Sequence, residues 1–321
     1  MYRIGIDLGG TNIAVGLVNE FCRIVTKKST PTLAKRESDD ITADMARLCL
    51  EVCAEAKTPI TEIESIGIAT PGIANLDNGC VEYSCNLPFR RYPIVKKLAS
   101  MLDIDESKIK IANDANAAAY GEAVAGAARG SSDSIMVTLG TGVGGGIILG
   151  GKILTGFNHA AGEIGHIVIE TNGAQCGCGR RGCWEAYSSA TGLSNMTKEK
   201  MKELKLKGIS SILFDEAEKD GKVSARTAFN AMKRGDKYGA MVVDEYIKYL
   251  AEGITNIINI FQPEILTIGG GVCNEKEYLT KPLLEIVESE QYTRNNVNKT
   301  KVVTAVLGND AGIIGAAVLG M

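Results

Sequence analysis

The apolar positions of the chain follow a strand-like pattern in some segments and a helical one in others. Four short apolar runs have the length of strands: residues 2–7, 13–18, 63–69 and 109–112. Between them, Thr42 to Ala56 places its apolar side chains at the 3.6-residue period of a helix. The turn Leu8-Gly9-Gly10-Thr11 joins the first two runs and predicts a β-hairpin with glycines at its tip. An alanine-rich helix is predicted from about Ala115 to Ala128, with Gly130 placed to end it.

The opening pattern returns in the middle of the chain. Residues 134–149 again read as strand, glycine turn and strand, and Leu139-Gly140-Thr141-Gly142 matches the first turn. This weak internal repeat predicts two related α/β halves, and no linker separates them, so we expect a cleft between packed domains. The rest is predicted to be helical up to Phe261, followed by strands at 264–268 and 302–306 and a C-terminal helix. We expect a small domain of residues 1–112 plus about 309–321, and a large one of residues 113–308.

The charge balance and the cysteine content narrow the class of protein. Lys and Arg number 35 and Asp and Glu 38, which predicts no nucleic-acid or anionic-membrane partner. Residues 134–151 carry no charge over about the length of a membrane span, but seven glycines divide them, so two strands fit better. The nine cysteines are odd in number and no secretion signal is visible, which argues against a disulfide scaffold and predicts a cytoplasmic protein.

The glycine turns are candidate phosphate sites. Glycines let backbone N–H groups approach phosphate oxygens, and the Thr11 hydroxyl adds a donor. Asp7 would repel a phosphate unless a cation intervened, so we expect it to hold Mg²⁺ through water. A second glycine turn follows at 140–146 and a third cluster at 269–271, whereas an ordinary hairpin turn remains the alternative for any one alone. Neither hairpin turn fits the P-loop or the dinucleotide fingerprint.

Two further sets of residues carry candidate chemistry. Asp114 stands between a predicted strand and the alanine-rich helix, where the helix N-terminus should keep it ionised. It could accept the proton of an attacking hydroxyl, or it could simply cap the helix. His166 and three clustered cysteines, Cys176, Cys178 and Cys183, form a Cys₃His set suited to tetrahedral Zn²⁺. The alternative is three reduced thiols near an unrelated histidine.

Taken together, these motifs resemble the ROK family of sugar kinases (repressors, open reading frames, kinases) in the actin-like ATPase superfamily. The matching segments run along nearly the whole chain: Asp7-Leu-Gly-Gly-Thr11, Pro71-Gly72, Asn86-Leu87, Asn113-Asp114-Ala-Asn116, Leu139 to Gly146, Gly162-Glu-Ile-Gly-His166, Cys176 to Glu185, and Gly269-Gly-Gly271. The resemblance implies an α/β fold of two actin-like (ribonuclease H-like) domains with the active-site cleft between them.

The resemblance also implies roles for individual residues. Asp114 would be the catalytic base, and His166, Cys176, Cys178 and Cys183 would bind a structural Zn²⁺. The residues implied to contact the sugar are Asn86, Asn113, Glu163, His166 and Glu185. Those implied to contact ATP are Asp7, Gly9, Gly10, Thr11, Asn12, Gly140, Thr141, Gly142, Val143, Gly144, Gly270 and Gly271. His159 matches no family position and is interpreted as a loop residue.

Two departures from the family pattern concern the substrate sites. Asn12 stands where lysine is common, and Phe89-Arg90-Arg91 replaces the aromatic-rich segment of many glucokinases. The second departure bears on the choice of sugar.

The function predicted from the resemblance is ATP-dependent phosphorylation of a hexose, with glucose to glucose 6-phosphate preferred. N-acetylmannosamine kinase and fructokinase are alternatives within the family. Two alternatives come from other functional classes. A sugar-responsive repressor would need a DNA-binding domain, for which the six residues before Asp7 leave no room. An ATP-independent sugar-binding protein would bind sugar without turnover. Family membership also implies ATP, Mg²⁺ and Zn²⁺ as cofactors and a homodimer or homotetramer.

Overall fold

The computed structural model describes residues 1–321, which divide into two compact units by their internal contacts. The first unit contains Met1–Met136, Gly146–Gly162 and Ala305–Met321. The second contains Val137–Gly145 and Glu163–Thr304. The domain boundaries predicted from the sequence, at residue 112 and about residue 309, stay a prediction, because these units are defined by contacts within each unit and not by domain type.

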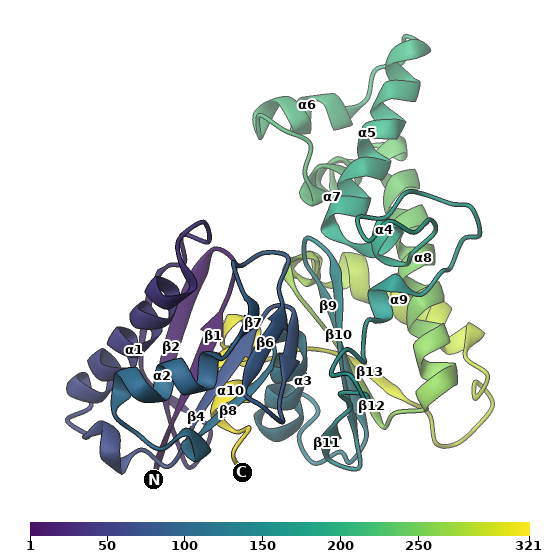
Figure 1. The fold of residues 1–321 in the computed structure, drawn as a ribbon. Helices are drawn as coiled ribbons and strands as arrows, with labels where there is room; N and C mark the ends of the chain where they lie inside the picture. The colour runs from purple at the N-terminus through teal and green to yellow at the C-terminus, as the bar shows by residue number, and fades with distance from the viewer. The chain divides into compact units, whose positions relative to one another are not determined.

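The first unit is built on a five-stranded sheet of order β3-β2-β1-β4-β8. Its strands are β1 (Tyr2–Leu8), β2 (Asn12–Asn19), β3 (Ile24–Pro31), β4 (Ile66–Thr70) and β8 (Ile109–Asn113). The first three strands are antiparallel neighbours, whereas β1, β4 and β8 run parallel (Figure 1). A small second sheet consists of β5 (Ile73–Asn75), β6 (Cys80–Tyr83) and β7 (Arg90–Tyr92).

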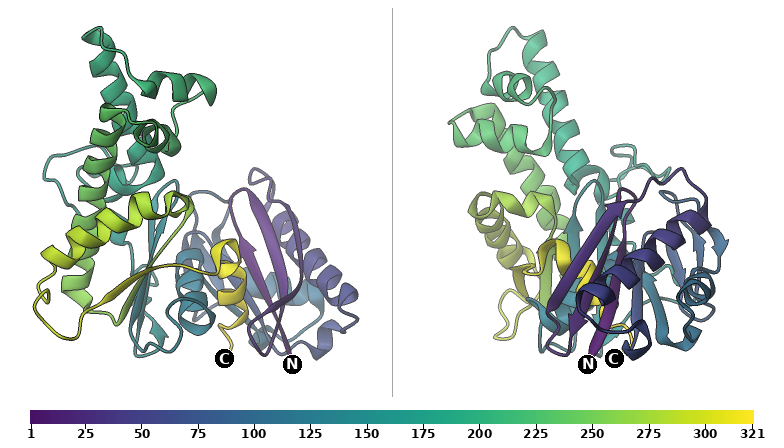
Figure 2. Two further views of the ribbon diagram at one scale, coloured as in Figure 1. Left: turned by 180° about the vertical axis from the view of Figure 1, so that it is seen from behind. Right: turned by 90° about the vertical axis from the view of Figure 1, so that its left-hand side faces the viewer.

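Helices cover both faces of the five-stranded sheet. On one face lie α1 (Ser38–Glu55) and α2 (Ile94–Leu102), and on the other α3 (Asp114–Ala125) and α10 (Ala311–Ala317) (Figures 1 and 2). Alternate β1 residues Ile4 and Ile6 pack into the α1–α2 core. Between them Gly5 allows α10 to touch the strand, since a Cβ at Gly5 would lie 1.8 Å from the Ile313 carbonyl oxygen.

A second five-stranded sheet has the order β11-β10-β9-β12-β13. Its strands are β9 (Ser134–Leu139), β10 (Val143–Leu149), β11 (Lys152–Ile153), β12 (Ile265–Gly269) and β13 (Lys301–Thr304). Like the first sheet, it places its first strand at the centre, the second and third on one side, and the fourth and fifth on the other. The two sheets therefore form the repeat that the two glycine turns predicted.

The second unit adds a set of helices to its part of this sheet. They are α4 (Glu185–Ser188), α5 (Ala190–Leu206), α6 (Ile212–Lys219), α7 (Ala225–Lys233), α8 (Lys237–Phe261) and α9 (Glu277–Glu290). Short 3₁₀ turns across the chain are η1 (Ile60–Glu62), η2 (Glu106–Lys108), η3 (Ile164–His166), η4 (Gly271–Glu275) and η5 (Gly308–Asp310). Trp184 is fully buried, and its indole N–H donates to the Tyr249 carbonyl at 3.0 Å, which fixes the cysteine-rich loop on α8.

Several predicted elements are wrong in detail. The alanine-rich helix ends at Ala125 with Gly126 as its cap, and Gly130 lies beyond it. The segment predicted to be helical after residue 149 contains β11 and a long irregular stretch before α4. The last strand ends at Thr304 rather than Val306, because the Val306 N–H bonds to the Glu122 side chain.

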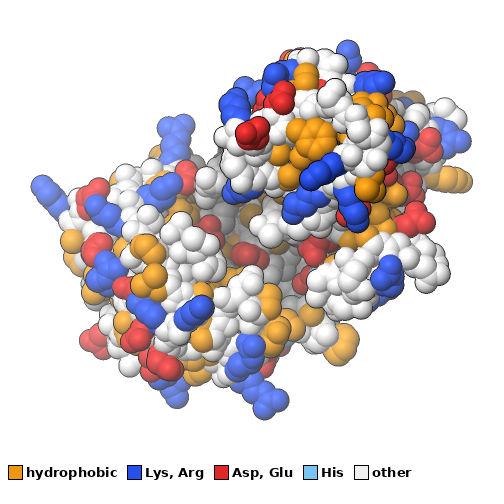
Figure 3. Space-filling model, turned by 90° about the horizontal axis from the view of Figure 1, so that it is seen from above, with side chains coloured by type: hydrophobic (Ala, Val, Ile, Leu, Met, Phe, Trp, Pro, Cys, Tyr) orange, Lys and Arg blue, Asp and Glu red, His pale blue; other side chains and the backbone are white.

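The uncharged segment 134–151 forms β9 and β10, as the sequence predicts. No helix of the structure has the length and apolar character needed to cross a membrane. Lys and Arg side chains are interspersed with Asp and Glu on the face seen in Figure 3.

Candidate functional site

Asp114 is the first residue of α3, where the parallel strand β8 ends. The preceding residue, Asn113, caps the helix by accepting the N–H groups of Ala115 and Asn116 at 2.9 and 3.3 Å. Because Asn113 takes the capping role, the alternative that Asp114 is only an N-cap is wrong. The Asp114 carboxylate accepts one N–H, from Ala115 at 2.9 Å, and keeps further acceptor capacity.

The environment of Asp114 and Asp7 disfavours their charged forms. Burial raises the pKa of Asp114, and nearby backbone N–H groups and Asn113 offset this only in part. The stabilisation that the helix N-terminus was expected to give this carboxylate is therefore opposed by its burial. Burial, together with the charge of Asp114, raises the pKa of Asp7 from 3.8 to about 6. Two neighbouring, part-buried carboxylates form the kind of site that a divalent cation would stabilise.

The first glycine turn leads from β1 to β2. Gly9 closes it by donating its N–H to the Asn12 carbonyl at 2.9 Å, and its own carbonyl accepts the Thr32 hydroxyl at 2.6 Å. Gly10, Thr11 and Asn12 are exposed at the tip. The turn can therefore offer backbone N–H groups and the Thr11 hydroxyl to a phosphate.

The structure brings Asn86 next to this turn. Asn86 is exposed in the loop between β6 and β7, and a Cβ built at Gly10 would lie 3.5 Å from the Asn86 Cβ. The other predicted amide, Asn113, uses its oxygen for the helix cap and donates Nδ2 to the Gly72 carbonyl at 3.1 Å. One amide hydrogen of Asn113 remains for the predicted sugar contact.

In the second unit, Glu185 joins the second glycine turn to the cysteine-rich loop. Its Oε2 accepts the Val143 N–H at 3.0 Å, and its Oε1 lies 3.6 Å from the Cys176 sulfur. A Cβ at position 142 would lie 2.2 Å from Glu185 Oε2, so a residue larger than glycine would displace this carboxylate. Gly140 accepts the N–H of Ala190 at 2.9 Å, and the Thr141 carbonyl accepts the Thr191 hydroxyl at 2.7 Å.

The third glycine cluster follows β12. Gly270 has a φ of 96°, and a Cβ there would lie 2.4 Å from the Leu139 carbonyl oxygen. This position therefore requires glycine both for its backbone angle and for its contact with β9. Gly271 has open space beside it and can present its backbone to a ligand. The structure also brings Val143 and Gly144 into β10, directly after the second turn.

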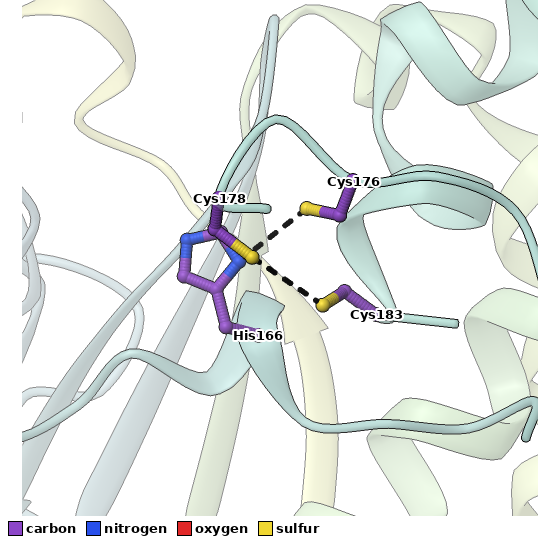
Figure 4. Close-up of side chains that lie close together, drawn as sticks. All are labelled: His166, Cys176, Cys178 and Cys183. Carbon is purple, nitrogen blue, oxygen red and sulfur yellow. Dashed lines mark hydrogen bonds between the residues drawn. The ribbon is translucent and has the colours of Figure 1, made fainter. Parts of the chain in front are cut away.

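The predicted Cys₃His set comes together. The ligand atoms of His166, Cys176, Cys178 and Cys183 all lie within 4.8 Å of one another, and their side chains point toward a common centre (Figure 4). The Cys178 and Cys183 sulfurs are 3.6 Å apart, and the Cys176 sulfur is 3.7 Å from His166 Nδ1. Tetrahedral zinc with Zn–S bonds of about 2.3 Å places neighbouring sulfurs about 3.8 Å apart. The donor set and its spacing therefore fit Zn²⁺.

The pKa values of the thiols in this cluster are shifted in different directions. Burial raises the pKa of Cys176 to about 12 and also raises that of Cys183. A backbone N–H bond from Arg180 lowers the pKa of Cys178. A bound cation would reverse the effect of burial, because it stabilises thiolates.

His166 connects this cluster to Glu163. With Nδ1 facing the cysteines, its Nε2 lies 4.0 Å from the Glu163 carboxylate, which is exposed. Glu163, His166 Nε2 and Glu185 thus offer acceptors and a ring nitrogen around the cysteine cluster, as a hydroxyl-rich ligand requires. His159 lies in the first unit, where its Nε2 is 3.4 Å from the Asp77 carboxylate, consistent with the loop position predicted for it.

Sequence reasoning missed the residues that hold these groups in place. A Cβ at Gly312 would lie 2.7 Å from the Asp7 carboxylate, so this glycine gives Asp7 its space. The bond between Glu185 and Val143 spans 42 residues of sequence. The glycines of residues 308–312 were a signal for the contact between Gly312 and Asp7. No spacing rule could reveal the bond between Glu185 and Val143.

Comparison with known proteins gives a consistent result over the whole chain. Residues 3–321 match the ROK family. The chain is 38% identical to a glucokinase of Thermotoga maritima, over 98% of this chain and 95% of that protein. It is 29% identical to an N-acetylmannosamine kinase of Escherichia fergusonii, over 99% and 98%.

The fold comparison agrees with the sequence comparison. A crystal structure of a ROK family glucokinase from Streptomyces griseus in complex with glucose and AMPPNP superposes with a TM-score of 0.79 at 29% identity. The match covers 99% of both chains. The predicted α/β fold of the actin-like class is confirmed.

Proposed function

The chain belongs to the ROK family, and on that premise we propose that it is an ATP:hexose phosphotransferase that converts glucose to glucose 6-phosphate. The observation that carries the proposal is Asp114, a part-buried carboxylate with free acceptor capacity at the start of α3, whose charge acts on the second carboxylate, Asp7. The identity of 38% to a glucokinase supports glucose as the preferred sugar.

In the proposed reaction Asp114 accepts the proton of the sugar hydroxyl. The hydroxyl oxygen then forms a bond to the γ-phosphorus of ATP, the bond from that phosphorus to the bridging oxygen breaks, and ADP leaves. The raised pKa of Asp114 makes it a better proton acceptor than an ordinary aspartate, provided that it is ionised.

The glycine turns supply donors for the phosphates. Gly9, Gly10, Thr11 and Asn12 form one proposed contact segment, with exposed N–H groups at its tip. The proposed contacts of the second unit are Gly140, Thr141, Gly142, Val143, Gly144, Gly270 and Gly271. Backbone N–H groups held by the fold stabilise phosphoryl charge without reorganising during the reaction.

The proposed sugar contacts combine carboxylates, amides and a ring nitrogen. Glu163 and Glu185 would accept hydrogen bonds from sugar hydroxyls, His166 would use Nε2, and Asn86 and Asn113 would add amide contacts. A sugar bound to these groups would bury them, and a molecule without the matching hydroxyls would then leave their polar atoms without partners.

Two metal ions belong to the proposal. Asp7 would hold Mg²⁺ through water, and this ion neutralises phosphate charge. Cys176, Cys178, Cys183 and His166 Nδ1 would hold Zn²⁺, which ties the loop bearing Glu185 to the segment bearing Glu163. Zinc analysis of protein purified without chelator should give one equivalent, and protein that contains no zinc after such a purification would refute this site.

The remaining features of the proposal concern the cell and the assembly. Nine free cysteines suit the reducing cytoplasm, where ATP is available. We expect no nucleic-acid partner, given the mixed surface charge, and a homodimer or homotetramer on the pattern of the family. Light scattering of the purified protein tests the assembly.

The experiment that tests the activity is ADP release from MgATP across a panel of sugars. The panel contains glucose, N-acetylmannosamine, fructose, mannose, allose and N-acetylglucosamine. We expect the highest kcat/KM with glucose. Preference for N-acetylmannosamine would keep the kinase and correct the sugar, whereas no turnover by folded, zinc-loaded protein would refute the proposal.

A further inference from the structure

The loop that carries Asn86 is closed at its base. It links β6 to β7 through residues 84–89, and the Ser84 N–H donates to the Phe89 carbonyl at 3.3 Å. Leu87 is 4% exposed and Phe89 is fully buried, so both anchor the loop in the core of the first unit. Asn86 lies between the base and Leu87, exposed and next to Gly10.

Arg90 holds that base together. Its Nη1 donates to the Ser84 carbonyl and, at 2.8 Å, to the Phe89 carbonyl, so one guanidinium nitrogen bridges the two ends of the loop. The guanidinium also lies 4.1 Å from the centre of the Tyr83 ring, and Tyr83 is its direct cross-strand partner. The site suits arginine and does not suit lysine, because the planar guanidinium stacks on an aromatic ring and forms hydrogen bonds at its edge.

The base of the loop is also linked, through Gly72, to the start of α3. A Cβ at Gly72 would lie 2.1 Å from the Tyr83 carbonyl oxygen and 2.9 Å from the Ser84 Cα, so the two segments are in close contact. The Gly72 carbonyl in turn accepts the Asn113 amide at 3.1 Å, one residue before Asp114. The loop held by Arg90 is thus fixed relative to Asp114 within the first unit.

We propose that Arg90 is a positioning residue for the sugar, which holds the 84–89 loop so that Asn86 meets a hydroxyl beside Asp114. This inference rests on the proposed hexose kinase activity and extends it to a residue without direct contact to the sugar. The donors of Arg90 are directed at the loop backbone, so its role is to preorganise the loop. Without the Arg90 hydrogen bonds, the loop would become ordered only when the sugar binds, and the free-energy cost of this ordering would weaken sugar binding.

The chain offers a matched control in the next residue. Arg91 is also exposed and also lies on β7, where its φ is 48°, but its side chain makes no hydrogen bond to the loop backbone. The charge of Arg91 acts on Glu82, away from the loop carbonyls. Removal of Arg91 therefore changes the surface charge by the same amount as removal of Arg90, without opening the loop.

The test compares steady-state kinetics of the wild type with R90A, R90K and R91A. For R90A we expect the KM for glucose to rise by about 10-fold, while kcat and the KM for ATP stay within about 2-fold. R90K should recover only part of this loss, and R91A should match the wild type. An unchanged glucose KM in R90A, or an equal rise in R91A, would overturn the inference.

A second readout reports on the loop itself. Cys85 is exposed beside Asn86, so its alkylation by iodoacetamide, followed by peptide mass spectrometry, measures loop order. Glucose should slow alkylation of wild-type Cys85, and R90A should react faster in the absence of sugar. Equal rates in R90A and R91A would contradict the role of Arg90 even if both variants are stable.

The outcomes separate the two proposals. If wild-type protein phosphorylates glucose but R90A keeps its KM, the positioning role fails and the kinase stands. If the wild type binds glucose without turnover, the kinase fails, and the glucose Kd from calorimetry replaces KM in the same comparison of variants. If no sugar binds, both proposals fail.

Discussion

Glu122 is a buried carboxylate, and its replacement tests how much its hydrogen bonds to the backbone stabilise the first unit. It lies in α3, two turns after Asp114, and is 0% exposed. Its Oε1 accepts the N–H groups of Val306 and Leu307 at 2.9 and 2.8 Å, and its Oε2 accepts the Ala127 N–H at 2.7 Å. No cation pairs with it in the structure, so three backbone donors alone stabilise it.

We predict that Glu122→Gln destabilises the protein by about 2.5–6 kcal/mol. The amide can place its oxygen toward Val306 and Leu307, but its NH₂ group then faces the Ala127 N–H. This removes one charge-assisted hydrogen bond, worth about 1.5–3 kcal/mol, and leaves a buried donor unsatisfied at about 1–3 kcal/mol. The carboxylate has its place because Gly126 has no side chain: a Cβ there would lie 2.1 Å from Oε2.

Urea unfolding of Glu122→Gln and wild type measures this difference. The exposed Glu37 of the same unit, whose side chain does not cap α1, gives the matched control Glu37→Gln, for which we expect a change below about 0.5 kcal/mol. Hydrogen exchange should show the loss locally, at Ala127, Val306 and Leu307. A loss below about 1 kcal/mol with unchanged exchange at these amides would refute the reasoning.

Three further predictions follow from the site. Because the pKa of Asp7 is raised to about 6, its neutral form stabilises the folded protein fully below about pH 4, and this stabilisation is lost as pH rises through about 6. Without added Mg²⁺, the free energy of unfolding of Asp7→Asn in urea should therefore exceed that of the wild type by up to about 3 kcal/mol at pH 8 but not at pH 4. Equal differences at both pH values would contradict this. Cys183→Ser should lower the zinc content and Tm together, and full zinc occupancy in this variant would argue against the site. Gly142→Ala should displace Glu185 from the Val143 N–H and lower kcat/KM for glucose by about 10-fold or more, measured by ADP release; wild-type kinetics would show that the contact is unimportant.

The elements with a clear hydrophobic period could be predicted from the sequence. The β1–β2 hairpin and β9–β10 were predicted because apolar runs flank glycine turns. By contrast, β3 was missed because its sequence, IVTKKSTP, is mostly polar, as suits a strand at the edge of the sheet. The short strands β5, β6 and β7 were missed because their pairing depends on tertiary contacts rather than on a periodic pattern.

The candidate site was predictable to the extent that its chemistry is local. The Cys₃His set could be predicted because its cysteines lie within eight residues and only two histidines occur in the chain. The Glu185–Val143 hydrogen bond and the hydrogen bonds from Arg90 to its loop could not be predicted, since both depend on backbone atoms that the fold brings together. The burial that raises the pKa of Asp114 could not be predicted either, because burial is a tertiary property.

The central claim is that Asp114 drives phosphoryl transfer from ATP to glucose. The most direct measurement is ³¹P NMR of MgATP and glucose with the wild type and with Asp114→Asn. We predict a glucose 6-phosphate resonance with the wild type and a rate at least about 10²-fold lower with the variant, which should keep its fold and its glucose affinity. A wild-type rate in Asp114→Asn, or no sugar phosphate with folded, zinc-loaded wild type, would contradict the account.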